Sequence, residues 1–176
     1  MEAGSATAEG EAVLAALEHV AAMKWGERST ILIEGRAAVA YDSEEPLSES
    51  TRGFLDEAFK ARGWRWSTED PLVPTGNCSF PDGDCRLKDP TELHLTFSAK
   101  PWPGEDDYRG EDPNLLQWDR FVVEPVAGQE GYKVHVRWLG SFTWRGGHQA
   151  ELGGEGLLVT RGNDGLVVES VMQWIT

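Results

Sequence analysis

The sequence predicts an α+β domain: a twisted, cone-like antiparallel sheet of about five or six strands, covered on one face by two N-terminal helices. Two observations support this prediction. The first 63 residues contain two segments with the 3.6-residue apolar period of amphipathic helices. In the second half of the chain apolar and polar residues alternate, as in strands that bury one face. Such a sheet needs a cover on its apolar face, and the helices are available to provide it.

The bulk composition fits one folded domain. The chain has 176 residues, of which 40% are hydrophobic, and this is enough to bury a continuous core. Residues 1–10 are acidic and rich in small side chains, so we expect a flexible tail there. The single α+β domain is expected to cover residues 11–176.

The first helix is predicted to run from Glu11 towards Gly26, because a glycine favours a helix end. Its apolar face is formed by Val13, Leu14, Leu17, Val20 and Ala21. Residues 29–41 are β-branched and apolar, with Gly35 near their middle, and predict one bent strand or a tight hairpin.

The second helix is predicted over residues 48–63. Ser48 or Ser50 suits its N-cap, and Gly63 suits its C-terminal stop. An extended piece starts at residues 64–67, and a loop rich in Pro, Gly, Asp and Asn occupies residues 69–90. A loop this long is unusual inside a compact domain, so it should be functional, tied down or mobile.

The remaining strands are expected at residues 91–97, 115–126, 131–144 and 154–175. The last of these segments predicts a hairpin around Asn163-Asp164-Gly165, whose residues tolerate positive φ. Alternation assigns one group of side chains to the core face: Leu93, Leu95, Phe97, Tyr132, Val134, Val136 and Trp138.

Charge is the strongest compositional signal. The chain has 30 acidic and 16 basic residues and a net charge of −14. An anionic surface repels phosphate backbones and anionic membranes, so we expect no nucleic-acid or membrane binding, while a basic protein partner is compatible. No apolar stretch approaches the roughly 18 residues of a membrane span. The N-terminus lacks signal-peptide features, which predicts a cytoplasmic protein if the chain is complete, or a secreted or periplasmic one if a leader was removed.

The residues that could carry catalysis form no recognisable constellation. Neighbouring strands could bring His94 and His135 together with Glu92 or Asp119, as a metal site or an acid–base pair. Alternation, however, points both histidines away from the core face. His19 lies beside the apolar stripe of the first helix, where a structural role is expected. The sequence contains no nucleophile elbow and no phosphate-binding glycine loop, so we assign no catalytic residue, no metal and no cofactor.

Both cysteines, Cys78 and Cys85, lie in the sequence CSFPDGDC. Their spacing suits neither a zinc site nor a thioredoxin-type redox pair. The Pro-Asp-Gly turn would bring them opposite each other, so a disulfide is favoured over two free thiols. A ring this small would stabilise the fold by only about 2.5 kcal/mol.

Aromatic side chains give the best indication of a binding site. We expect a ligand-binding set of Trp118, Asp119, Tyr132, Trp138 and Trp144, lining an apolar cavity between sheet and helices. The alternative is that the aromatic residues simply fill the core. Arg120 lies on the opposite face of its strand from Asp119, so the register decides which of them reaches inside.

Residues 132–175, YKVHVRWLGSFTWRGGHQAELGGEGLLVTRGNDGLVVESVMQWI, show a long aromatic strand, a Gly-marked turn, an apolar strand and a last strand ending near Trp174. This pattern resembles the closing strands of nuclear transport factor 2-like domains, which include polyketide-cyclase-like (SnoaL-like) proteins. The resemblance covers roughly a quarter of the chain. It implies a cone that encloses a pocket, and the fold hosts enzymes, binders and dimer adaptors alike.

Three functions follow from these observations. The leading hypothesis is a non-catalytic domain whose pocket binds a small apolar ligand or a partner, with a homodimer compatible. The first alternative is an enzyme of the cyclase, isomerase or dehydratase kind, which needs an ionisable residue inside the cone. The second is an acidic inhibitor or immunity-type protein that binds a basic partner through the anionic loops around residues 42–50 and 104–112.

Overall fold

The structure of the chain is a computed structural model. It describes residues 7–22, 36–73, 86–89, 91–102, 131–144 and 147–175, with the backbone alone for residues 141–151 and 172–175.

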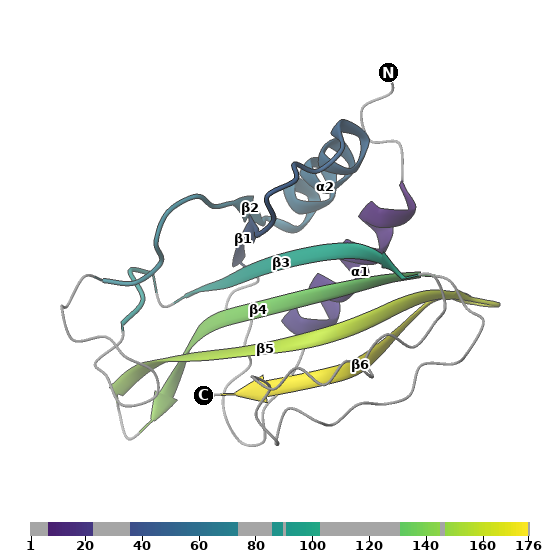
Figure 1. Cartoon of the computed structure of the whole chain (residues 1–176). Helices are drawn as coiled ribbons and strands as arrows, with labels where there is room; N and C mark the ends of the chain where they lie inside the picture. Colours follow the sequence, from purple (N-terminus) through teal and green to yellow (C-terminus); the bar gives the residue numbers. More distant parts are fainter. Residues whose placement is uncertain are drawn as a thin grey trace.

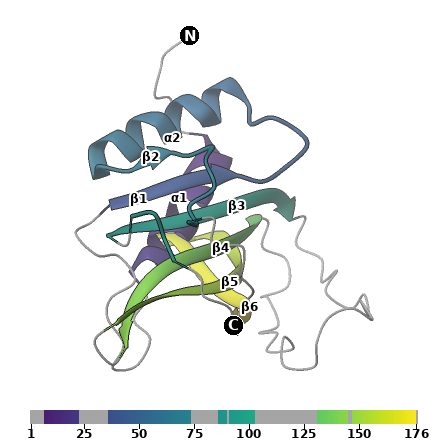
Figure 2. The same cartoon turned by 90° about the vertical axis from the view of Figure 1, so that its left-hand side faces the viewer.

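Two helices pack on one face of a six-stranded sheet (Figure 1). The elements in chain order are α1 (Ala8–Ala21), β1 (Arg36–Tyr41), α2 (Glu49–Arg62), β2 (Arg65–Trp66), β3 (Glu92–Trp102), β4 (Gly131–Trp144), β5 (Gly147–Gly162) and β6 (Gly165–Ile175). The strand order is β2-β1-β3-β4-β5-β6, and the sheet is open. Figure 2 shows how strongly the sheet curves around α1. The predicted α+β class is therefore confirmed.

The N-terminal ends of the two helices are capped as their sequences require. Helix α1 begins at Ala8, three residues before the predicted start, because the Thr7 side chain accepts a hydrogen bond from the Gly10 amide at 2.9 Å. Ser48 caps α2 and accepts from the Thr51 amide at 3.2 Å, which confirms one of the two predicted caps. Neither helix in the described part of the chain is long and apolar enough to cross a membrane.

The C-terminal stop of α2 is also confirmed. Gly63 adopts a left-handed conformation with φ of 74°. The predicted end of α1 near Gly26 falls outside the described residues, which follow α1 only as far as Ala22.

The sheet differs from the prediction at its N-terminal edge. Strands β3 to β6 are antiparallel, but β1 runs parallel to both β2 and β3. Helix α2 connects β1 to β2, and a helical crossover returns the chain in the same direction. The apolar character of residues 36–41 indicates a strand, but only this connection determines its direction. The predicted first piece of that strand, before residue 36, falls outside the described residues.

The predicted C-terminal hairpin is confirmed. Strands β5 and β6 pair from Gly153↔Ile175 to Gly162↔Gly165, with Asn163 and Asp164 at the turn. Gly165 has φ of 126°, a conformation that side-chain-bearing residues rarely adopt. The register shifts between Gly156 and Leu157, as at a β-bulge.

The core lies between α1 and the face of the sheet that alternation assigned to it. Leu95, Phe97 and Val136 are each 1% exposed, and they pack with α1 residues such as Val13 and Leu17. We call this the helix face of the sheet and the opposite side the outer face. A second, smaller cluster of buried residues comprises Trp102, Leu158 and Val171.

Candidate functional site

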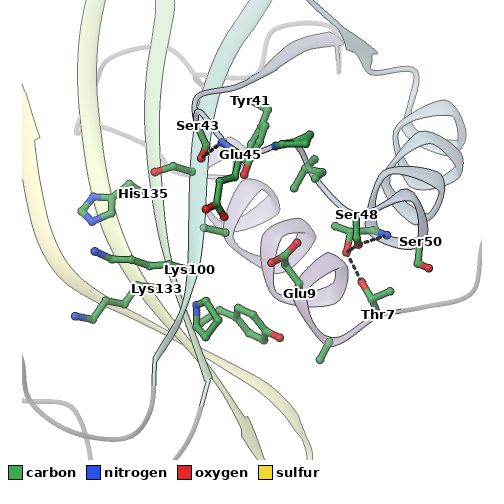
Figure 3. Close-up of a pocket in the computed structure, with 18 residues that line it drawn as sticks. Thr7, Glu9, Tyr41, Ser43, Glu45, Ser48, Ser50, Lys100, Lys133 and His135 are labelled. Carbon is green, nitrogen blue, oxygen red and sulfur yellow. Dashed lines mark hydrogen bonds between the residues drawn. The ribbon is translucent and has the colours of Figure 1, made fainter.

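The largest described cavity is a groove of about 710 Å³ at one end of the sheet. We call it the end groove. The pairing of β1 with β3 stops at Tyr41↔Phe97, while β3 continues to Trp102. Residues 98–102 of β3 therefore have no neighbour from β1, and the groove follows this free edge. Its opposite wall comes from residues 43–51 and the start of α1 (Figure 3).

Hydroxyl groups tie the two helix ends together on this wall. The Thr51 hydroxyl accepts a hydrogen bond from Ser48 Oγ at 3.0 Å, and it shares a second hydrogen bond with the Thr7 hydroxyl, 2.9 Å away. Thr51 is buried, so this small network fixes the N-terminus of α1 against that of α2. The electropositive ends of both helices face the groove together with the carboxylates of Glu9 and Glu45, which leaves this wall mixed in charge (Figure 3).

The strand wall of the end groove has a different character. Figure 3 shows the side chains of Lys100, Lys133 and His135 beside one another, on the side of β3 and β4 that faces away from the helices. The end groove therefore wraps around the free edge of β3, from the helix ends to the outer face.

A second cavity of about 490 Å³ adjoins the end groove and is mostly apolar. It lies where the first turns of α1 meet the ends of β3, β4 and β5. Its lining is Ala8, Ala12, Pro101, Trp102, Gly131, Tyr132, Val159, Thr160, Arg161 and Leu166. We call it the apolar cavity. Ala8, Pro101 and Tyr132 line both spaces, so these three residues separate the apolar cavity from the groove.

The predicted ligand-binding residues divide into three groups. Tyr132 lines both cavities, as expected of a pocket residue. Trp138 is 2% exposed and belongs to the core, where its ring crosses Gly153 so closely that a Cβ there would lie 2.2 Å from Trp138 Cζ2. Only the backbone of Trp144, in β4, is described.

Four further predicted residues fall outside the described part of the chain: Trp118, Asp119, Cys78 and Cys85. Their assignment to a ligand site and to a disulfide stays a prediction.

His94 and His135 share the outer face, as alternation predicted, but they do not meet. His94 lies opposite Leu139 in the β3–β4 pair, whereas His135 lies opposite Ser98. His94 and Ser98, the partner of His135, are four positions apart on β3, which is about 14 Å along an antiparallel strand. Within the described ranges no group of three His, Cys, Asp or Glu residues could hold a metal ion.

His94 belongs instead to a structural ion-pair network. Its Nε2 lies 3.8 Å from Glu92 Oε1, and Glu92 accepts two hydrogen bonds from Arg65, at 2.7 and 3.0 Å. Burial lowers the pKa of His94, while the negative charges of Glu92 and Asp89 act in the opposite direction. A bidentate Arg65–Glu92 pair with an imidazole beside it stabilises the edge where β2, β1 and β3 meet.

One ionisable group on the helix face was missed by sequence reasoning. Glu155 is 3% exposed and lies opposite Val136, so its side chain points into the core. Its Oε1 is 3.5 Å from His19 Nε2 on α1, and its Oε2 has no hydrogen-bond partner in the described part of the chain. The alternation of Glu155 with Leu157 and Val159 was the signal that could have found it. A carboxylate next to an imidazole can exchange a proton. Of the described cavities, one of about 180 Å³, also lined by His135 and Arg137, includes Glu155, and none includes His19.

No protein-family model, no curated protein and no solved structure matches this chain. The resemblance of residues 132–175 to nuclear transport factor 2-like domains therefore remains a prediction from pattern.

Proposed function

We propose that the protein binds a small, largely apolar molecule in the apolar cavity, with Tyr132 against it, and does so without catalysis. One observation carries this proposal. A mostly apolar space of about 490 Å³ is lined by Tyr132, the one predicted ligand-binding residue whose described side chain lies at a cavity. Ligand pockets of proteins typically measure about 300–1,000 Å³ and are lined mainly by apolar and aromatic groups with a few polar ones.

The lining of the apolar cavity supports binding over catalysis. Its described residues include no carboxylate and no imidazole, and its one charged group, Arg161, is held by Glu11 at 2.7 Å. Tyr132 and Thr160 supply hydroxyl groups that can orient a ligand by hydrogen bonds. Tyr132 is the one described residue of this set whose type can serve as a general acid or base, and no carboxylate or imidazole lines the cavity to share a proton with it.

Titration with N-phenyl-1-naphthylamine, an uncharged apolar fluorophore, tests the proposal. The wild-type protein is expected to bind it saturably, with enhanced fluorescence. The Ala8→Trp variant places an indole at the exposed start of α1, between the two cavities, and is expected to weaken binding at least tenfold. Ala61→Trp is the matched control, because Ala61 is exposed near the far end of α2. Equal binding by the wild type and both variants would contradict the proposal.

The second candidate function is an acid–base enzyme, and the buried Glu155–His19 pair is the observation that favours it. A carboxylate with one unpartnered oxygen can act as a general base if a ligand reaches it. The Glu155→Gln variant keeps the shape of the side chain and removes the base. If it changes the affinity for the fluorophore more than twofold, the ligand extends to Glu155 and the enzyme becomes the better proposal. An unchanged affinity leaves the ligand confined to the apolar cavity.

A further inference from the structure

The free edge of β3 directs backbone groups into the end groove. The Phe97 carbonyl accepts a hydrogen bond from the Asp42 amide at 2.8 Å, so the backbone groups of Phe97 point towards β1. Every second residue of a strand directs its backbone groups to the same side. Ala99 and Pro101 therefore direct theirs past the end of β1, into the end groove, which both residues line.

This edge offers one donor and two acceptors: the Ala99 N–H, the Ala99 C=O and the Pro101 C=O. No strand in the described part of the chain pairs with the edge beyond Phe97. An extended peptide can add to an unpaired strand edge by main-chain hydrogen bonds. A proline limits such pairing, so the edge suits a segment of about five residues, which matches residues 98–102 in length.

The wall of the end groove that faces this edge determines the charge of the occupant. Glu9 of α1 and Glu45, before α2, both extend into the groove (Figure 3). Among the described residues neither carboxylate has a basic partner, whereas Glu11 of α1 is paired with Arg161. Each helix N-terminus contributes about half a positive charge, so two carboxylates outweigh two helix ends by about one charge. The wall therefore attracts a single cationic side chain.

The outer side of the same edge is different. Ala99 packs at the margin of the core on the helix face, whereas Ser98 and Lys100 lie on the outer face. Residues directly opposite each other on paired strands point to the same face. A partner residue opposite Ala99 would thus point towards Glu9 and Glu45, and its two neighbours would point to the outer face. Lys100 is exposed there and repels a second cation.

We propose that the free edge of β3 binds an extended peptide segment of a partner protein, which pairs with Ala99 as an added strand. The segment has one Lys or Arg, flanked by uncharged or acidic residues, and this basic side chain lies beside Glu9 and Glu45. Main-chain hydrogen bonds provide affinity, and the carboxylates select the side chain. The net charge of −14 attracts a basic partner and opposes pairing with a second copy of this chain.

This inference does not depend on the ligand proposed for the apolar cavity. Ala99, Glu9 and Glu45 line the end groove and not the apolar cavity. Variants of Ala99 and Glu45 should therefore leave the affinity for N-phenyl-1-naphthylamine unchanged, so the two proposals can fail separately.

NMR titration of the isotope-labelled, full-length protein with the acetylated and amidated peptide VTKTV tests the inference. Alternation places its lysine opposite Ala99 and both threonines on the outer side. We expect saturable shifts at Ala99 and Glu45, and slower solvent exchange of the Ala99 amide, because this amide gains a hydrogen-bond partner. The peptide VTETV should bind at least tenfold more weakly. VTKTV methylated on its three central amide nitrogens keeps its charge and should not slow the exchange of the Ala99 amide.

Three variants separate the backbone contact from the charge contact. Ala99→Pro removes the N–H on the free edge and leaves the hydrogen bonds to β4 in place, and should weaken binding at least tenfold. Glu45→Gln should weaken binding about fivefold. Glu44→Gln is its matched control, because Glu44 is an exposed neighbour that does not line the groove, and it should leave the affinity unchanged. Circular dichroism of each variant establishes that the fold is intact.

Four results would overturn the inference. The first is the absence of saturable shifts at the free edge. The second is equal weakening by Glu44→Gln and Glu45→Gln, because binding would then follow net charge. The third is slow exchange of the Ala99 amide in the protein alone at every concentration, which would show that the edge is already paired within the chain. The fourth is slow exchange only at high protein concentration, which would identify a second copy as the occupant.

Discussion

The two faces of this sheet are built from the same strands and have opposite chemistry. On the helix face, Leu95, Phe97 and Val136 are nearly inaccessible and pack against α1. On the outer face, His135 and Arg137 follow each other at every second residue of β4, and Lys100 of β3 lies opposite Lys133. Successive residues of a strand point to opposite sides, so every second residue contributes to one face only. The main core lies on the helix face, while the outer face combines exposed charges such as Arg137 with buried residues such as Lys133 and its β5 partner Leu158.

Each face also holds an exception. Glu155 puts a carboxylate into the apolar helix face, where burial of a charged group is expensive. On the outer face, Lys133 lies opposite Lys100 and is only 4% exposed. Buried charged groups are expensive unless they are paired.

The largest expected difference between the faces is in stability, and it is measured by mutating two neighbouring residues of β3. Phe97→Ala removes a buried ring that contacts Tyr41 and Trp66, and should lower the free energy of unfolding by about 3–5 kcal/mol. Ser98→Ala, one residue further, should change it by less than about 0.5 kcal/mol. Urea denaturation of both variants measures the difference. Similar losses would show that the outer face contributes to stability as the helix face does.

Replacing Glu155, the carboxylate buried on the helix face, is expected to make the protein more stable. Glu155→Met replaces the buried carboxylate with an apolar side chain of similar length, and should raise the free energy of unfolding by about 1–2 kcal/mol. The gain is expected because His19 is 38% exposed and remains solvated after its partner is removed. Thermal denaturation at pH 7 measures the change. A loss of stability would mean that the Glu155–His19 pair stabilises the helix–sheet contact more than its burial costs.

The smallest expected effect concerns the outer-face histidines. The folded protein lowers the pKa of both His94 and His135, so the unfolded chain takes up protons more readily. Their contribution to stability is therefore complete above the unfolded pKa of about 6.5, and it is lost as the pH falls from there through the lower folded values. Denaturation at pH 7.5 and at pH 5.5 should show a smaller loss for His135→Gln than for the wild type. A pH dependence that His135→Gln does not change would contradict this.

The sequence predicted the parts of the fold that depend on local patterns. Alternation placed Leu93, Leu95 and Phe97 on the core face, and the residues of the Gly165 turn specified the last hairpin. The direction of β1 was not predictable in this way, because it is determined by the crossover through α2 and not by the residues of the strand.

The candidate site was less predictable than the fold. Tyr132 was found because the aromatic residues of its strand were expected to line a cavity between sheet and helices, and it does line two cavities. Trp138 carries the same pattern but fills the core, since Gly153 on the neighbouring strand makes room for its ring. Both cavities owe their existence to the place where β1 stops and the helix ends meet. Such an arrangement depends on contacts between segments far apart in the chain, and no local spacing encodes it.

Mapping amide chemical shifts during a titration with N-phenyl-1-naphthylamine tests the central claim most directly. The claim is that an apolar ligand binds in the apolar cavity, apart from Thr96 and Arg137 on the outer face. We expect the largest shifts at Ala8, Ala12, Tyr132 and Val159, and none at Thr96 or Arg137. Shifts centred on the outer face, or no saturable shifts at all, would contradict the claim.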